Sequence, residues 1–197
     1  MSRLLSGAKW GKVRLMQIPL AEPEVRKLSV SEYYRMAEAG IIKPSERVEL
    51  LNGQVIQMAP IGPRHATIVD KLIEIFVEKR KGRYRVRSGG PIRIPDYNEP
   101  QPDIVLYKTK LKEKHPEPAD IYLVVEVSDT TLAIDSGDKL RAYEQGGIKE
   151  YWIVDISKKA VRIYTLKAGS YGLGTKKQGT VSPHGFSDVT VDIGRLF

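Results

Sequence analysis

Cysteine is absent from this chain of 197 residues, which excludes disulfide bonds and zinc sites built from cysteine. Long apolar runs are also absent, because no segment approaches the roughly 18 residues of a membrane span. Residues 1–20 lack the uninterrupted apolar stretch and the small-residue cleavage site of a signal peptide. We therefore expect a cytoplasmic protein with no membrane partner.

Negative charge is in the minority, with 24 Asp and Glu against 32 Lys and Arg, a net charge of +8. A basic excess favours a polyanionic partner, most commonly nucleic acid. The densest run is KRKGRYRVR, residues 79–87, which is either a charged helix end and edge strand that resist aggregation or a patch that contacts phosphates. Its basic residues are Lys79, Arg80, Lys81, Arg83, Arg85 and Arg87.

The chain divides into an N-terminal arm, residues 1–27, and a single domain, residues 28–197. The domain opens with a short helix in residues 28–40, where Ser29 and Glu32 form a capping box. Residues 47–58 are typical of a β-hairpin, because Asn52-Gly53 is the preferred pair for a type I′ turn. A long helix follows Pro63 and ends at Gly82. Its apolar face contains Ile68, Leu72, Ile75 and Phe76.

Short strands dominate the rest of the chain. The expected strands are residues 83–88, 91–95, 102–107, 120–129, 149–156, 161–166 and 188–193. One more helix is expected in residues 136–147, with Ser136 as its N-cap and Gly146 as its stop. This order predicts a mixed α/β domain, a central mixed sheet flanked by helices with an additional N-terminal helix and hairpin.

Glu126 stands near the end of the most apolar strand, in the segment YLVVEVSD. A carboxylate buried there without a partner is costly. Alternation along the strand puts Glu126 on one face with Tyr122, Val124 and Ser128. If the strand that begins at Asp103 is its neighbour, the two carboxylates meet. Such a pair repels unless a cation lies between them, and hard oxygen ligands suit Mg²⁺ or Mn²⁺.

The helix after Glu126 offers a basic partner. Lys139 and Tyr143 are four residues apart and share one helical face, from which the lysine could reach back to the carboxylates. Asp135 and Asp138 lie just before Lys139 and are expected to cap the N-terminus of the helix.

A family resemblance rests on several of these motifs together. They are Pro102-Asp103, Glu126-Val127-Ser128, the acidic run that ends in Asp138-Lys139, and GGIKEYWIVD at residues 146–155. With the hairpin, the proline-rich step into His65 and the final DVTVDIGRLF, they resemble the Uma-two family of putative endonucleases over residues 28–197. That family belongs to the PD-(D/E)XK nuclease superfamily, so the resemblance implies a restriction-endonuclease-like core.

The resemblance also implies roles. Asp103 and Glu126 would bind the divalent metal, Mg²⁺ or Mn²⁺, of an endonuclease that hydrolyses phosphodiester bonds in nucleic acid. DNA is the expected substrate, although RNA would use the same metal chemistry. Apart from the resemblance, a homodimer would suit cleavage of a duplex, because its two-fold symmetry matches that of the duplex. The superfamily places a lysine where this chain has Ser128, and the resemblance suggests that Lys139 replaces it. Glu49 resembles an additional acidic residue near the metal. His65 and Tyr143 would be accessory residues.

Other interpretations stay open. Glu126 could instead pair with Arg85 or Arg87, and the other candidates could have structural roles. The protein could bind nucleic acid without cutting it, because of the departure at Ser128. It could be a glycosidase that uses Asp103 and Glu126, although two Trp and three Phe are few for a sugar site. Its basic face could also serve only assembly.

Overall fold

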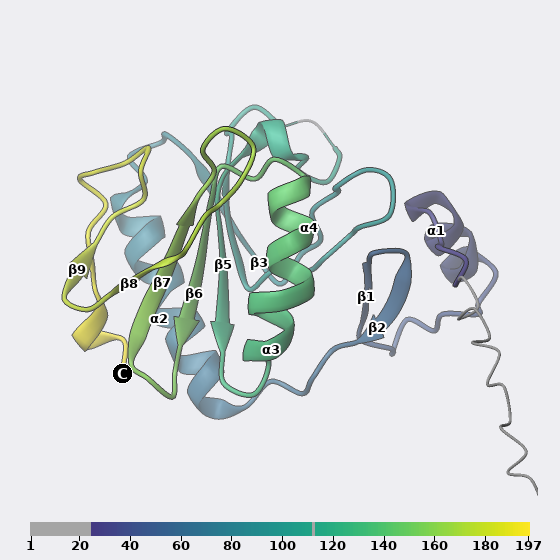
Figure 1. The fold of residues 1–197 in the computed structure, drawn as a ribbon, viewed down its shortest axis with the longest axis horizontal. Coiled ribbons are helices and arrows are strands. Elements are labelled where there is room, and N and C mark those ends of the chain that lie inside the picture. The colour runs from purple at the N-terminus through teal and green to yellow at the C-terminus, as the bar shows by residue number, and fades with distance from the viewer. Residues whose placement is uncertain (1–24, 112) are drawn as a thin grey trace, which may run out of the picture.

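The fold is built on one mixed sheet, seen in a computed structural model that describes residues 25–111 and 113–197. The predicted arm therefore lies outside the described residues except for residues 25–27. The sheet has six strands in the order β3-β4-β5-β6-β7-β8 (Figure 1). They are β3 (Arg85–Ser88), β4 (Ile104–Tyr107), β5 (Ile121–Ser128), β6 (Glu150–Asp155), β7 (Ala160–Thr165) and β8 (Thr175–Lys177).

Only β5 and β6 are parallel, and the other neighbours in this sheet are antiparallel. A parallel pair needs a crossover connection. Here the crossover consists of three short helical pieces, α3 (Leu132–Ile134), the π-helix η2 (Asp135–Lys139) and α4 (Leu140–Gln145). The prediction of a mixed α/β domain with helices flanking a central sheet is confirmed.

The sheet has an apolar core on each face, and helices cover both faces (Figure 1). On one face, α2 (Pro63–Lys79) packs through Ile68, Val69, Leu72 and Phe76, because these positions recur with helical period. On the other face lies α4, whose Tyr143 belongs to a cluster rich in tyrosine. The predicted apolar face of α2 is confirmed, except that Ile75 is only partly buried.

A β-bulge changes one predicted side-chain direction in β5. The pairing of β4 with β5 shifts register between Leu106 and Tyr107. Tyr122 therefore packs on the α2 side, against Phe186, whereas Val124 lies on the α4 side. The expectation that Tyr122 shares a face with Val124 and Glu126 is wrong, because a bulge interrupts strict alternation.

The N-terminal elements are α1 (Val30–Glu38) and a hairpin of β1 (Val48–Leu51) and β2 (Gln54–Gln57). The capping box of Ser29 and Glu32 is present, as predicted. The hairpin turns at Asn52 and Gly53, whose φ values of 50° and 76° are those of a type I′ turn. Leu50 and Glu99 exchange backbone hydrogen bonds of 3.4 and 2.8 Å, which tie the hairpin to the loop before β4.

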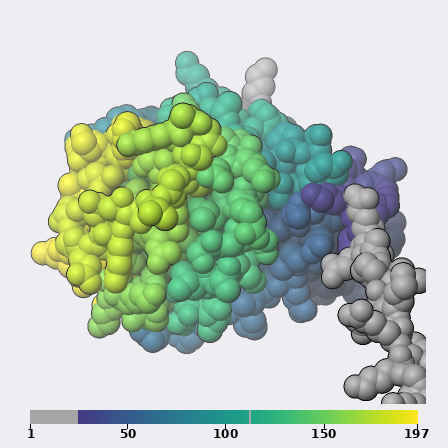
Figure 2. Space-filling model, in the orientation of Figure 1, coloured from purple at the N-terminus to yellow at the C-terminus, as the bar shows by residue number. Residues whose placement is uncertain are grey.

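The C-terminal segment covers the α2 side of the sheet. It contains β9 (Thr180–Val181), β10 (Val191–Asp192) and the 3-10 helix η3 (Ile193–Arg195), and β9 pairs with β10. This segment and α1 lie at opposite ends of the long axis of the molecule (Figure 2). Throughout residues 25–111 and 113–197, none of the helices combines the length and the apolarity that a bilayer crossing needs.

Two predicted elements differ from the structure. Residues 91–95 form no strand and contribute only an isolated bridge between Ile94 and Asn98. We expected a helix to begin after Ser136, but the chain is helical from Leu132 onward, so Ser136 is not an N-cap. Its hydroxyl donates to the carbonyl of Leu132 at 2.6 Å. Gly146 ends the helix as predicted. A 3-10 turn, η1 (Pro118–Asp120), precedes β5.

The packing of α2 predicts a contrast between two neighbouring residues. Phe76 is fully buried beside Trp152, whereas Val77 is 38% exposed. Phe76→Ala should lower the free energy of unfolding by about 3–5 kcal/mol, because the cavity left in the core stays partly unfilled. Val77→Ala should change it by less than about 0.5 kcal/mol. Urea titration of both variants measures the two values, and equal losses would contradict this packing.

Candidate active site

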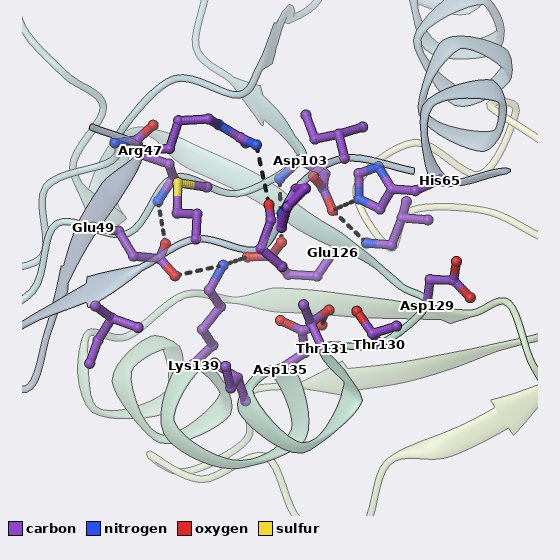
Figure 3. A pocket seen from close by; sticks show the side chains of 18 of the residues that line it. Arg47, Glu49, His65, Asp103, Glu126, Asp129, Thr130, Thr131, Asp135 and Lys139 are labelled. Carbon is purple, nitrogen blue, oxygen red and sulfur yellow. Dashed lines mark hydrogen bonds and ion pairs between the residues drawn. The ribbon is translucent and has the colours of Figure 1, made fainter. Parts of the chain in front are cut away.

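A cavity of about 540 Å³ opens where β1, the start of α2 and the adjacent ends of β4 and β5 meet the π-helix η2 (Figure 3). Its lining includes Glu49, His65, Asp103, Glu126 and Lys139, which are five of the six predicted catalytic and accessory residues. Residues far apart in the sequence thus converge on one hollow.

Asp103 and Glu126 meet as predicted, because β4 and β5 are neighbours. Ile104 is opposite Val125 in the antiparallel register. Asp103, which precedes Ile104, therefore lies beside Glu126, which follows Val125. The backbone N–H of Val127 donates to Asp103 Oδ2 at 2.7 Å. The backbone N–H of Asp103 lies 3.4 Å from Glu126 Oε2.

Lys139 is the cation beside these carboxylates. Its Nζ lies 2.9 Å from Glu126 Oε1 and 3.2 Å from Glu49 Oε1, and all three side chains are almost fully buried. Burial lowers the pKa of Lys139, but the carboxylates of Glu126, Glu49 and Asp135 outweigh burial and raise it above its usual value. The surrounding carboxylates therefore favour the cationic form of Lys139.

Two donors converge on one oxygen of Glu126. The hydroxyl of Tyr143 donates to Oε1 at 2.7 Å, beside the ammonium of Lys139. Burial raises the pKa of Glu126 well above its usual value, and the neighbouring carboxylates add to this, whereas Lys139 opposes it. The two donors stabilise the ionised carboxylate. Because both bond to the same oxygen, the prediction that Lys139 and Tyr143 share a helical face toward Glu126 is confirmed.

Glu49 reaches the same cluster from β1. Its Oε1 forms an ion pair with Lys139, and its Oε2 accepts a hydrogen bond of 2.9 Å from the backbone N–H of Gln101. These contacts fasten the hairpin to the loop that leads into Asp103. Glu49 is therefore buried and holds the ammonium of Lys139 instead of facing solvent.

His65 lies in the first turn of α2 and points at Asp103. Its Nε2 is 3.1 Å from Asp103 Oδ2. This hydrogen bond raises the pKa of His65, burial opposes the rise, and the charges of Asp103, Asp129 and Asp135 add to it. The contact makes His65 a partner that orients the Asp103 carboxylate.

Asp135 is a residue of the site that the sequence analysis misjudged. It is 2% exposed, and its Oδ2 accepts hydroxyl hydrogen bonds from Ser128 and Thr131, each at 2.6 Å. Asp138 is exposed and pairs with Arg141 at 2.6 Å. The prediction that both aspartates cap the helix N-terminus is therefore wrong. The i,i+4 spacing of Asp135 and Lys139 is the sequence signal that could have found it.

The basic run is not gathered at the cavity. Lys79 bonds to Thr190, and Lys81 and Arg83 pair with Asp188 in the C-terminal segment. Along α2, Lys79 lies about 21 Å from His65, at 1.5 Å per residue. Among the residues that the structure describes, none of the six basic residues lines this cavity. They are Lys79, Arg80, Lys81, Arg83, Arg85 and Arg87.

The alternative partner for Glu126 is not observed. Arg87 donates to the carbonyl of Pro91 at 3.1 Å and lies over the ring of Tyr107. Within the described residues, neither Arg85 nor Arg87 forms an ion pair with Glu126, which pairs with Lys139 instead.

The donor set fits a hard divalent cation held by few protein ligands. In residues 25–111 and 113–197, no three His, Cys, Asp or Glu side chains are grouped to hold a metal ion. Asp103 Oδ1 nevertheless has no hydrogen-bond partner among the described residues, and Glu126 Oε2 has only the long contact of 3.4 Å with the backbone N–H of Asp103. Mg²⁺ commonly binds through one or two carboxylates and retains several waters, so this pair suits Mg²⁺ better than zinc.

The buried ion pair predicts how stability depends on pH when the lysine is removed. Lys139→Met leaves Glu126 buried without its cation, which should cost about 3–5 kcal/mol at pH 7. Lys139 lowers the pKa of Glu126, so its removal should raise that pKa further. The deficit should therefore be small at low pH, where Glu126 is protonated in both proteins, and grow as pH rises through the range in which Glu126 ionises in the unchanged protein but not in the variant. Urea unfolding between pH 4.5 and 8 measures it.

The same experiment has an internal control. Glu126→Gln in the Lys139→Met background removes the unpaired charge and should recover much of the loss and flatten its pH dependence. A deficit that is independent of pH would show that lost packing, rather than the unpaired carboxylate, destabilises the variant.

Comparisons with known proteins bear on the fold and the family of this chain. A crystal structure of a putative nuclease belonging to DUF820 from Anabaena variabilis has the same fold, with a TM-score of 0.67 and 14% sequence identity over 86% of this chain and 97% of that one. The search of curated proteins found no match. The model of the Uma2 family, described as putative restriction endonuclease, matches residues 30–193. The chain belongs to the Uma2 family.

Proposed function

We propose that this protein is a metal-dependent endonuclease that hydrolyses phosphodiester bonds in nucleic acid, with DNA as its substrate. One observation carries the proposal. Glu126 is buried at the floor of an open cavity, one of its oxygens is held by Lys139 and Tyr143, and the other is left beside Asp103. A cluster that serves only stability does not need a cavity above it or a second carboxylate facing the first.

The cation would be held by Asp103 and Glu126. A divalent ion in such a site supplies a Lewis acid for a phosphoryl oxygen and lowers the pKa of a bound water. His65 and the backbone N–H of Val127 both bond to Oδ2 of Asp103, which orients the carboxylate and leaves Oδ1 without a hydrogen bond among the described residues.

Lys139 would stabilise charge. Its contacts with two carboxylates, Glu126 at 2.9 Å and Glu49 at 3.2 Å, favour the ammonium form, which donates hydrogen bonds. An ammonium group fixed in a buried position stabilises negative charge that develops on a nearby phosphate more strongly than an exposed one does. Glu49 and Glu126 hold it in place, which fits the proposed replacement of the lysine that the superfamily has at Ser128.

The chemistry predicts which carboxylates matter. Asp103→Asn and Glu126→Gln should each reduce nicking of supercoiled plasmid with Mg²⁺ or Mn²⁺ by at least about 100-fold, because each removes an anionic ligand from the site. The matched control is Asp138→Asn, an identical change at a side chain that is 61% exposed and pairs only with Arg141 among the described residues. It should cleave as the unchanged protein does.

Circular dichroism and urea unfolding establish that the variants are folded, and EDTA should stop the cleavage. Cleavage that persists in EDTA, or in both carboxylate variants, would refute the metal mechanism. Calorimetric binding of Mn²⁺ that is lost in Asp103→Asn would support the site independently of the substrate chosen.

A further inference from the structure

The segment that delivers Lys139 is attached to the sheet by a buried hydrogen-bond network. Asp135 Oδ2 accepts from Ser128 Oγ and Thr131 Oγ1, each at 2.6 Å. The carbonyl of Asp135 accepts from the hydroxyl of Tyr151 at 3.0 Å. Asp135 is thereby bonded to β5 through its side chain and to β6 through its backbone, and it is 2% exposed.

Two contacts join the helical crossover to β5. Asp135 bonds to Ser128, and Lys139 bonds to Glu126. Ser128 and Glu126 are two residues apart on one face of the strand, a distance of about 6.6 Å. Asp135 and Lys139 are the first and last residues of η2. A shift of the crossover along the strand would therefore break both contacts.

The backbone between these contacts is unusual. Residues 135–139 form a π-helix, η2, rather than continuing the α-helix. Single π-turns are rare and occur frequently at functional sites. Asp135 and Lys139 are the first and last residues of this π-helix, and Figure 3 shows Lys139 extending from it toward Glu126. A change of register here would move Lys139 away from Glu126.

We infer that Asp135, bonded to Ser128 and Thr131, is a positioning residue that fixes the register of η2 and so places the Lys139 ammonium against Glu126. Ser128 thereby acquires a role at the strand position where the superfamily has its lysine: it anchors the segment that carries the replacement. The importance of this placement for cleavage rests on the proposed nuclease function, whereas the placement itself does not.

The test separates hydrogen bonding from charge and from general stability. Asp135→Ala removes the acceptor, whereas Asp135→Asn keeps an oxygen that can accept both hydroxyl hydrogen bonds. The direct readout is the ¹⁵N NMR signal of the Lys139 ammonium, which burial should make slow to exchange with water, assigned by its loss in Lys139→Arg. The second readout is kcat and KM for plasmid nicking with Mg²⁺.

We expect Asp135→Ala to lose the protected ammonium signal and to lower kcat about 100-fold with little change in KM, because a displacement near 1 Å can have that effect. Asp135→Asn should keep the signal and stay within about threefold of the unchanged rate. Asp138→Asn, in the same turn but exposed, should match the unchanged protein in both readouts. If Asp135→Ala does not fold, Ser128→Ala, which removes one of the two hydroxyl donors, is measured instead and should weaken the protection.

A folded Asp135→Ala variant, or Ser128→Ala in its place, that keeps the protected signal would overturn the inference. Equal losses in Asp135→Asn and Asp135→Ala would also overturn it, because they would assign the effect to charge. If the unchanged protein cleaves no DNA, the nuclease proposal fails while the NMR comparison still decides the positioning role. If cleavage occurs and the NMR signal is insensitive to Asp135, the positioning role fails alone.

Discussion

The interaction on which the site depends is the buried contact of Lys139 with Glu126 and Glu49. A carboxylate at the end of a fully buried strand is unfavourable without a partner, and two of them more so. One ammonium joins the central sheet, the N-terminal hairpin and the crossover helix. Such a cluster contributes little net stability compared with an apolar core, but it defines a unique arrangement of three separate elements.

The two apolar cores explain how this polar cluster is held still. The α2 side of the sheet is a conventional aliphatic and aromatic core, and it fixes the helix whose first turn carries His65. The α4 side is rich in tyrosine, so its rings fill space while their hydroxyls reach polar partners, as Tyr143 and Tyr151 do. The chemistry is therefore supported by side chains that belong to the core itself.

Charge at the surface and charge in the cavity have different functions in this molecule. The run at residues 79–87 is the most basic segment of the sequence, yet Lys79, Lys81 and Arg83 fasten the end of α2 to the C-terminal segment. Lys139, by contrast, lines the cavity and is buried there against Glu49 and Glu126. The density of charge along the sequence therefore does not indicate which cation lies in the cavity.

The sequence by itself determined the local elements and their chemistry: the capping box at Ser29, the turn at Asn52-Gly53, the apolar face of α2 and the candidate residues Asp103, Glu126 and Lys139. The cap, the turn and the apolar face follow from short-range rules of capping, turn geometry and periodicity. Grouping the three candidates also required the assumption that β4 and β5 are neighbours, and the family resemblance. Only the tertiary structure decided the bulge that redirects Tyr122, the burial of Asp135 and the π-turn before Lys139. The bulge and the π-turn depend on contacts between β5, β6 and the crossover rather than on a short-range pattern. The i,i+4 spacing of Asp135 and Lys139 indicates a shared face but not the burial of Asp135.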